Sequence, residues 1–337
     1  MILVDAVFVN NGGGKVLLDY LVQTIEENGL DVFYLFDKRN LNDPKFTSLK
    51  HKKFINGTFY SKIKFYYSNK LKFNKIICFG NMPPLKKMNA VVYTYFQQKL
   101  FLEIPKELGF YLKIKLFLKS IIIKNLKKNT NFWIVQTSLI KTQLSKKFNI
   151  IENSILELPF YPSLKSISNT TSIKKENIFL YISNATSHKN HYRLIEAFEN
   201  FYEKFQFGEL YLTVYDNIEL INFIAKKNKS NIPIINLNKI EGTELEYIYQ
   251  KSKFVIFPSL SESFGLGLVE AIEFNCIIIG ANLPYTFEVC TPSLSFNPYD
   301  IESIEESFHK AMNSDYNNTI PKVSNKIKDI LKILNND

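Results

Sequence analysis

The fold is decided by residues 257–271, which read FPSLSESFGLGLVEA. An apolar run ends at Pro258, a polar loop follows, and a glycine-bearing turn opens a helix. Glu262 stands in the loop and Glu270 stands eight positions later on the helix. Ligands bind at the carboxyl ends of strands in open α/β sheets, where helix N–H groups suit an anion and carboxylates accept hydrogen bonds from hydroxyls. Taken singly, Glu262 is more typical of a helix cap and Glu270 of a solvated helix face than of a ligand contact, so their spacing carries the prediction of an anionic polyol site.

Apolar runs alternate with amphipathic segments of helix length along the whole chain. The runs lie at 3–9, 32–36, 75–79, 90–93, 132–136, 178–182, 210–215, 232–236, 254–257 and 276–280. Continuous apolar runs are typical of parallel strands that helices bury on both faces, so the predicted fold class is α/β. Pro, Ser, Thr and Asn cluster over 159–175. This cluster indicates a boundary between two similar domains, 1–160 and 161–320, followed by the segment 321–337.

The composition excludes several classes of protein. The chain has 337 residues, of which 46% are hydrophobic and 22% charged, and this argues against disorder, collagen and coiled coil. Three scattered cysteines and four histidines are too few for a disulfide framework or a zinc site. The N-terminus lacks the pattern of a secretory signal, and no apolar run approaches the roughly 18 residues of a spanning helix. We therefore expect a cytoplasmic or peripheral membrane protein.

The charge is divided unevenly along the chain. Residues 1–150 hold 25 Lys and Arg against 9 Asp and Glu, a balance of +16, whereas residues 151–337 hold 17 against 23, a balance of −6. Only Arg39 and Arg193 are arginine, so the lysine excess is also typical of an AT-rich genome. Codon bias predicts lysine everywhere and not this asymmetry, so a basic N-terminal half that faces an anionic partner is the better interpretation.

Three consecutive glycines, Gly12 to Gly14, follow the first apolar run and open the first helix. Residues without a Cβ atom let the backbone approach a ligand, and a helix N-terminus suits a phosphate. The spacing matches neither G-x-G-x-x-G nor G-x-x-x-x-G-K-[ST], which disfavours a nicotinamide or ATP site. A tight turn between strand and helix explains the glycines equally well.

Glu262 and Glu270, with seven residues between them around Phe264-Gly265-Leu266, resemble the E-x7-E motif of retaining glycosyltransferases of family 4. A second block, LYISNATSHKN at 180–190 followed by LIEAF at 194–198, resembles the segment that opens the donor domain of that family. The resemblance is specific over about 178–298 and is nearest to members that build bacterial surface polysaccharides such as O-antigen and capsule. It implies the GT-B fold, in which two Rossmann-like domains face each other across a cleft, and a C-terminal helix over 322–334 that packs back on the first domain.

The resemblance also assigns roles to residues of this chain. Lys189 would hold the donor diphosphate, Glu270 the ribose hydroxyls and Glu262 the transferred sugar, with Glu262 and Lys189 as the catalytic pair. The cradle around the phosphates would combine these side chains with backbone groups, and its members are Gly13, Gly14, Asn184, Lys189, Ser263, Phe264, Gly265, Leu266 and Glu270. Asn184 is a departure, because the family often has an arginine at that place, five positions before the lysine.

A second departure lies in the N-terminal half. Many family members carry a histidine after the fourth strand, whereas this chain reads Gln97-Gln98 there. A glutamine side chain hydrogen-bonds a sugar hydroxyl but is no base near neutral pH, so Gln97 and Gln98 are predicted on the acceptor and sugar side. The resemblance implies a UDP-sugar or GDP-sugar donor and a same-face displacement in which the leaving phosphate helps to deprotonate the acceptor. No Asp-x-Asp pair stands beside the site, so neither metal nor cofactor is expected.

The segment 105–128 reads as a basic amphipathic helix. Its apolar residues, Leu108, Leu112, Leu116, Phe117, Ile121 and Ile122, are interleaved with lysines. A core-packed helix with solvated lysines explains the pattern by itself. Residues 45–147, however, hold 22 Lys and Arg opposed only by Glu103 and Glu107, which favours an anionic membrane surface. We therefore expect a peripheral protein on the inner face of the cell membrane that receives a lipid-linked acceptor.

Together these features predict a retaining, metal-independent glycosyltransferase of the hexosyltransferase type that extends a lipid-linked saccharide in surface polysaccharide synthesis. Two alternatives remain open: a nucleotide-sugar epimerase-like enzyme on the same fold, and an inactive carbohydrate-binding subunit. A nucleic-acid partner is disfavoured, because two arginines are few for base recognition and no stacking motif is present.

Overall fold

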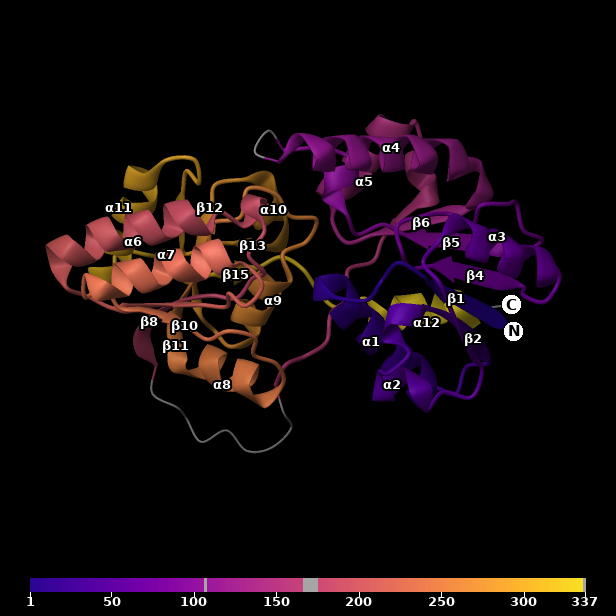
Figure 1. Ribbon diagram of the computed structural model, residues 1–337, viewed down its shortest axis with the longest axis horizontal. Helices are drawn as coiled ribbons and strands as arrows, with labels where there is room; N and C mark the ends of the chain where they lie inside the picture. The colour runs from indigo at the N-terminus through magenta and orange to yellow at the C-terminus, as the bar shows by residue number, and fades with distance from the viewer. Residues whose placement is uncertain (106–107, 166–174, 336–337) are drawn as a thin grey trace. The chain divides into compact units, whose positions relative to one another are not determined.

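A computed structural model describes residues 1–105, 108–165 and 175–335 (Figure 1). The chain forms two compact units. The first unit is built from Met1–Ile104, Gly109–Pro162 and the C-terminal segment from Ser324 onward. The second unit is built from Ser163–Val323 together with Pro105–Leu108. Each unit carries its own parallel sheet, so the α/β fold class is confirmed.

The sheet of the first unit has seven parallel strands in the order β3-β2-β1-β4-β5-β6-β7. Strand β1 pairs in register with β2 on one side and with β4 on the other, so it lies inside the sheet. Its residues are all buried, as expected for a strand that is covered on both faces. The strands are β1 (Ile2–Ala6), β2 (Val32–Asp37), β3 (Lys52–Ile55), β4 (Lys75–Cys78), β5 (Val91–Tyr95), β6 (Phe132–Val135) and β7 (Ile155–Glu157).

Helices cover both faces of this first sheet. They are α1 (Gly12–Glu27), α2 (Pro44–Thr47), α3 (Phe59–Ser68), α4 (Phe110–Leu126), α5 (Ser138–Phe148) and α12 (Ile327–Asn335). One core joins α1 and α12 to the sheet, and a second core on other strand residues contains Phe65 and Tyr66 of α3. Because successive side chains of a strand point to opposite faces, α3 covers the face opposite α1 and α12.

The C-terminal helix α12 belongs to the first unit although it follows the second in sequence. Ile327, Ile330 and Leu334 are buried in the core that contains α1. Lys75 Nζ donates to the carbonyl oxygens of Ile333 and Leu334, at 3.2 Å each. The helix begins at Ile327 and not at residue 322, because the Ile327 N–H donates to the Asn325 side chain and the preceding residues run as an extended connection.

The sheet of the second unit has six parallel strands in the order β10-β9-β8-β11-β12-β14. Strands β13 and β15 form a separate two-stranded antiparallel sheet. The strands are β8 (Glu176–Tyr181), β9 (Glu209–Leu212), β10 (Ile234–Asn236), β11 (Ser252–Phe257), β12 (Ile277–Ala281), β13 (Cys290–Thr291), β14 (Leu294–Phe296) and β15 (Ile320–Pro321). The central strands β8 and β11 are adjacent, and both end where the predicted site residues begin.

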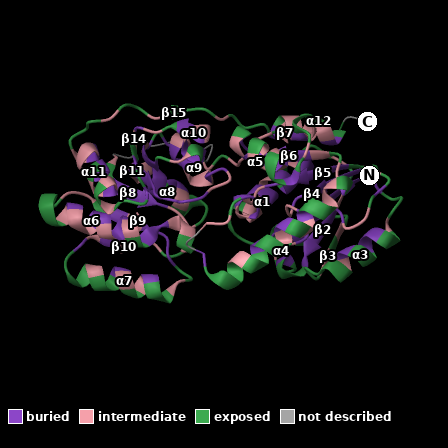
Figure 2. Ribbon diagram, turned by 90° about the horizontal axis from the view of Figure 1, so that it is seen from above, coloured by how far each residue is buried: buried purple, intermediate pink, exposed green. Residues whose placement is uncertain are grey.

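Aromatic packing holds the helices of the second unit on its sheet. Phe179 of β8 lies among Phe198, Phe254 and Phe308, with ring centroids 4.7 to 6.2 Å apart. The helices are α6 (His191–Phe205), α7 (Ile218–Lys229), α8 (Thr243–Lys251), α9 (Leu266–Glu273), α10 (Pro284–Val289) and α11 (Ile301–Met312). Figure 2 shows buried strands inside both units and helices whose outer sides are exposed.

Candidate functional site

The stretch 257–271 has the predicted strand, loop and helix. Strand β11 ends at Phe257, and α9 begins at Leu266. Gly265 precedes the helix with φ of 85°, a left-handed conformation that favours glycine. A Cβ atom on Gly267 would lie 3.1 Å from the Phe257 ring, so the first turn of α9 packs tightly on the strand end. The N-terminal turn of α9 therefore stands at the carboxyl end of β11, where the N–H groups that open a helix suit an anion.

The loop that follows β8 contacts the loop that follows β11. Lys189 ends the short helix η5 (Ser187–Lys189), and its carbonyl oxygen accepts a hydrogen bond from the Tyr181 hydroxyl at 3.0 Å. The Leu260 N–H donates to the His188 carbonyl oxygen at 2.8 Å. Lys189 Nζ lies 2.5 Å from Glu262 Oε1, and these side chains are only 16% and 13% exposed. The structure thus brings the two predicted catalytic residues together.

Glu270 occupies a different environment on the buried side of α9. Its carboxylate accepts a hydrogen bond from the Tyr249 hydroxyl of α8 at 2.8 Å. Burial raises the pKa of Glu270 from 4.5 to about 7, although the Tyr249 hydrogen bond lowers it. Nothing in the sequence marked Tyr249, because it is one of 19 tyrosines and its contact with α9 arises only on folding.

Half-buried His188 and buried His191 lie on either side of the lysine in the sequence. Burial, reinforced by the positive charge of Lys189, lowers the pKa of His188 to about 4 and that of His191 to about 3. Both rings are therefore neutral at physiological pH. Within the described residues, His188 Nδ1 and His191 Nε2 are buried without a hydrogen-bond partner. Lys189 is consequently the cation that this loop presents.

Asn184 and Arg193 both lie near this loop in sequence but make different contacts. Asn184 is exposed, and its Oδ1 accepts a hydrogen bond from the Thr186 hydroxyl at 3.2 Å. Arg193 donates to Asn190 Oδ1 at 2.9 Å. The Asn190 amide in turn donates to the carbonyl oxygens of Pro258 and Pro298. Arg193 therefore supports the loop through Asn190 and is not paired with Asn184.

In the first unit, the structure brings two predicted residues, Gly14 and Gln97, together. Gly13 and Gly14 lie in the first turn of α1, and Gln97 and Gln98 follow β5. A Cβ atom on Gly14 would lie 3.1 Å from Gln97 Nε2, so the glycine turn packs against this side chain. Gln97 Nε2 also donates to the Phe79 carbonyl oxygen at 3.2 Å. The predicted grouping of Gly13 and Gly14 with α9 joins residues of both units and stays a prediction.

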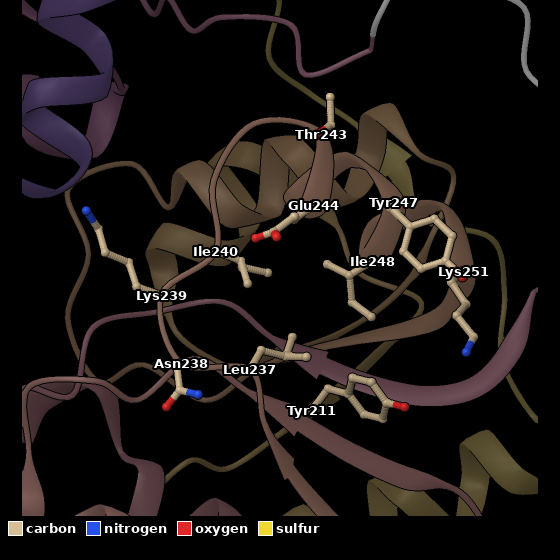
Figure 3. Close-up of a pocket in the computed structure, with 10 residues that line it drawn as sticks. All are labelled: Tyr211, Leu237, Asn238, Lys239, Ile240, Thr243, Glu244, Tyr247, Ile248 and Lys251. Atoms are coloured by element: carbon tan, nitrogen blue, oxygen red, sulfur yellow. The ribbon is translucent and has the colours of Figure 1, made fainter.

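A groove of about 700 Å³ lies on the second unit. It is lined by residues of β9, the loop after β10, and α8: Tyr211, Leu237, Asn238, Lys239, Ile240, Thr243, Glu244, Tyr247, Ile248 and Lys251. Leu237, Ile240 and Ile248 gather at its centre, with Lys239 and Lys251 at opposite ends (Figure 3). None of the predicted site residues lines this groove.

Neither a metal-binding cluster nor a membrane-spanning helix is found among the described residues. Over the three described ranges, no group of three or more His, Cys, Asp or Glu side chains is arranged to hold a metal ion. Every helix in the described part of the chain is too short or too polar to cross a bilayer.

Part of the chain matches known glycosyltransferases in sequence. Residues 165–328 match the family model described as glycosyl transferases group 1. The O-antigen chain mannosyltransferase RfbU of Salmonella typhimurium is 24% identical over 165 residues, which are 49% of this chain and 46% of RfbU. The capsular polysaccharide biosynthesis glycosyltransferase CapH of Staphylococcus aureus is 26% identical over 165 residues, 45% of this chain and 46% of CapH. The alignments thus span about half the length of these curated relatives.

Solved structures show the fold of the whole chain. Sucrose-phosphate synthase from Thermosynechococcus elongatus matches with a TM-score of 0.70 at 15% identity, covering 93% of this chain and 89% of that one. WaaG, a glycosyltransferase involved in lipopolysaccharide biosynthesis, matches with a TM-score of 0.67 at 16% identity, covering 93% and 90%. Both Rossmann-like units are matched, so the expected GT-B fold is confirmed. Residues 165–328 are therefore similar to the glycosyl transferases group 1 family, and the chain as a whole has the fold of GT-B glycosyltransferases.

Proposed function

We propose that this protein is a retaining glycosyltransferase of family 4 that moves a hexose from a nucleotide-diphosphate sugar to a saccharide acceptor in surface polysaccharide synthesis. The contact between Lys189 and Glu262 carries the proposal, since it joins the two motifs that resemble the family at one edge of the sheet. The names of RfbU and CapH support the link to O-antigen and capsule.

The donor would be a UDP-sugar or a GDP-sugar held mainly by the second unit. The Lys189 ammonium group and the N–H groups of Ser263 to Leu266 offer positive charge to a diphosphate. Glu270 offers a carboxylate to ribose hydroxyls, and Glu262 offers one to the transferred sugar. Asn184 would add a neutral side chain to this cradle, and the N–H groups of Gly13 and Gly14 would complete it.

In the proposed reaction the acceptor oxygen bonds to the anomeric carbon on the face from which the diphosphate departs. The bond between that carbon and the phosphate oxygen breaks, and the acceptor proton passes to the departing phosphate. Lys189 stabilises the charge that develops on the leaving group, and Gln97 or Gln98 holds a hydroxyl on the acceptor side. The chain has no Asp-x-Asp pair, and Lys189 already supplies a cation, so the proposal includes neither metal nor cofactor.

The acceptor would be linked to a lipid, and the protein would act at the inner face of the cell membrane. The lysine excess of residues 45–147 supports this part of the proposal, because a pyrophosphate lipid and the cytoplasmic leaflet are both anionic. The basic N-terminal domain would therefore meet the acceptor, while the second unit holds the donor.

Calorimetry with UDP and GDP, each with Mg²⁺ and with EDTA, tests the donor site. We expect micromolar binding of one nucleotide that does not depend on the metal. Incubation with the matching sugar nucleotide and a lipid-linked saccharide should then give a product whose anomeric configuration, read by NMR, equals that of the donor. An altered sugar nucleotide formed without acceptor would indicate an epimerase-like enzyme. Binding without transfer or hydrolysis would indicate an inactive carbohydrate-binding subunit.

A further inference from the structure

Phe8 has a backbone conformation that bulky residues rarely adopt. It is the third residue of a turn after β1, which the Val9 N–H closes on the Ala6 carbonyl oxygen at 3.1 Å, and its φ is 87°. Turns with positive φ at this place usually carry glycine or asparagine there, because a larger side chain crowds the backbone. Among the described residues other than glycine, positive φ otherwise falls on asparagine, glutamine or serine. Such strain persists only where surrounding contacts enforce it, and it gathers at functional sites.

Two buried aspartates hold this turn. Asp37 Oδ2 accepts a hydrogen bond from the Phe8 N–H at 3.2 Å, and Asp5 Oδ1 accepts one at 3.2 Å from the N–H of the residue before Phe8. Each carboxylate is itself held by a cation. Arg39 donates to both oxygens of Asp37 at 2.8 Å, and Lys62 Nζ of α3 lies 2.7 Å from Asp5 Oδ2. Asp5 and Lys62 are fully buried, so neither charge can leave the other, and the turn is fixed to α3.

Two glycines let neighbouring loops close on the turn. Gly57 follows β3 and Gly80 follows β4, so both lie with the turn at the carboxyl edge of the first sheet. A Cβ atom on Gly57 would lie 2.7 Å from Asp37 Oδ2, and one on Gly80 would lie 2.6 Å from the Val7 carbonyl oxygen. Approaches this close leave no room for a side chain. The strained conformation of Phe8 is therefore enforced from several sides.

The enforced conformation presents an aromatic pair at this edge of the sheet. The half-buried Phe8 ring has its centroid 6.2 Å from that of Phe59, the first residue of α3, which is 40% exposed. Lys62 Nζ lies 5.1 Å from the Phe8 centroid, a cation–π contact that helps to hold the ring. Half-buried Asn10 and exposed Asn11 follow in the same loop. Aromatic rings beside amides suit a ligand with both C–H faces and hydroxyl groups.

The turn is connected to a residue already predicted on the acceptor side. The Phe79 N–H donates to the Asp5 carbonyl oxygen at 2.7 Å, and the Phe79 carbonyl oxygen accepts from Gln97 Nε2 at 3.2 Å. The Gln97 N–H also donates to Asn81 Oδ1 at 2.6 Å in the loop after β4. Hydrogen bonds within the first unit thus link the strand end that carries Phe8 to Gln97.

We propose that Phe8, with Phe59 beside it, is the stacking platform for a sugar ring of the saccharide acceptor. A pyranose has a face of C–H groups, and this face packs on an aromatic ring because the ring face carries negative charge density. The inference rests on the proposed function, which gives the donor to the second unit and the acceptor to the first. A glycine at position 8 would relax the turn but would present no ring.

Saturation-transfer NMR on the full chain tests the platform. The probes are the methyl glycosides of mannose, galactose, glucose and N-acetylglucosamine. We expect at least one to bind, with the strongest transfer to the C–H protons of one ring face. Phe8→Leu should weaken its binding roughly three- to tenfold, whereas Phe8→Trp, which keeps an aromatic ring, should retain it. Binding that is unchanged in Phe8→Leu, or binding of none of the glycosides, would overturn the proposal.

Phe8→Asn separates the ring from the backbone. Asparagine adopts positive φ readily, so urea unfolding should show a folded variant, and this variant should lose glycoside binding as Phe8→Leu does. Tyr67→Leu is the matched control, because Tyr67 is 61% exposed near the other end of α3 and Lys86 Nζ lies 3.8 Å from its ring centroid. It should leave glycoside binding unchanged. An equal loss in Tyr67→Leu would contradict the assignment of the site to Phe8.

Nucleotide calorimetry on the same preparations separates this inference from the proposed function. Normal binding of UDP or GDP, together with glycoside binding that ignores Phe8, would overturn only the platform. Glycoside binding that depends on Phe8 in a chain that binds no nucleotide would overturn only the donor site. A fall in nucleotide affinity in Phe8→Asn, with glycoside binding intact, would assign the ring to the donor and overturn the platform.

Discussion

Lys189 Nζ and Glu262 Oε1 lie 2.5 Å apart although the two residues are 73 positions apart in sequence. The two carboxylates of the E-x7-E pattern therefore have different partners. Glu262 meets a cation, whereas Glu270 meets the Tyr249 hydroxyl in a buried place. Under the proposed function, a diphosphate that reached Lys189 would compete with Glu262 for the ammonium group and would free that carboxylate to accept a sugar hydroxyl.

Lys189→Ala should weaken the binding of the preferred nucleoside diphosphate roughly 10- to 100-fold, because it removes a charge-assisted hydrogen bond worth about 1.5–3 kcal/mol. Isothermal calorimetry measures this change. Lys204→Ala is the matched control, since Lys204 Nζ also lies 2.5 Å from a glutamate, Glu305, at an exposed position. Equal affinity in both variants would contradict the assignment of Lys189 to the diphosphate.

Glu270 should make folding stability fall as pH rises. Because its pKa is raised from 4.5 to about 7, the folded state holds the proton more tightly than the unfolded state does. The stabilisation is complete below pH 4.5 and is lost as pH rises through about 7, a change on the order of 3 kcal/mol. Urea unfolding of the natural chain and of Glu270→Gln, from pH 4.5 to 8, checks this. The two stabilities should converge at low pH and separate at high pH in favour of Gln; a difference that ignores pH would disprove the titration.

Tyr249→Phe should destabilise the second unit by about 1–3 kcal/mol, because it removes the hydroxyl donor of a buried carboxyl group. The loss should be larger at pH 8 than at pH 5, since the hydrogen bond favours the ionised form of Glu270. Urea unfolding at the two pH values measures it. Tyr192→Phe, at a position 43% exposed, serves as control and should change little. A loss that is the same at both pH values would mean that Tyr249 acts only through packing.

Gly13→Ala and Gly14→Ala should change stability in opposite directions. An added Cβ on Gly13 has no atom within 4 Å, so alanine there should stabilise by about 0.4–1 kcal/mol through the unfolded state. At Gly14 it would lie 3.1 Å from Gln97 Nε2 and displace the hydrogen bond to Phe79, at a cost of about 0.5–1.5 kcal/mol. Urea unfolding of both variants tests the contact; equal stabilisation would show that Gln97 moves freely.

The sequence alone was enough for the α/β class, the strand, loop and helix of 257–271, and the glycines that open the first helix. These features depend on local pattern, namely apolar runs of strand length, helix periodicity, and a glycine at position 265, where φ is positive. The resemblance around Lys189, Glu262 and Glu270 could also be read without coordinates, because it rests on residue types at set spacings.

Tertiary structure decided what those residues meet. The Lys189–Glu262 pair joins the loops that follow the adjacent parallel strands β8 and β11. The Tyr249–Glu270 hydrogen bond joins α8 to α9. These segments come together only when the chain folds. Tertiary structure also decided which side of α4 faces water: periodicity shows that a helix has faces, but both sides of α4 are apolar, so only the packing of Leu116 and Ile123 on the first unit reveals which one is left exposed.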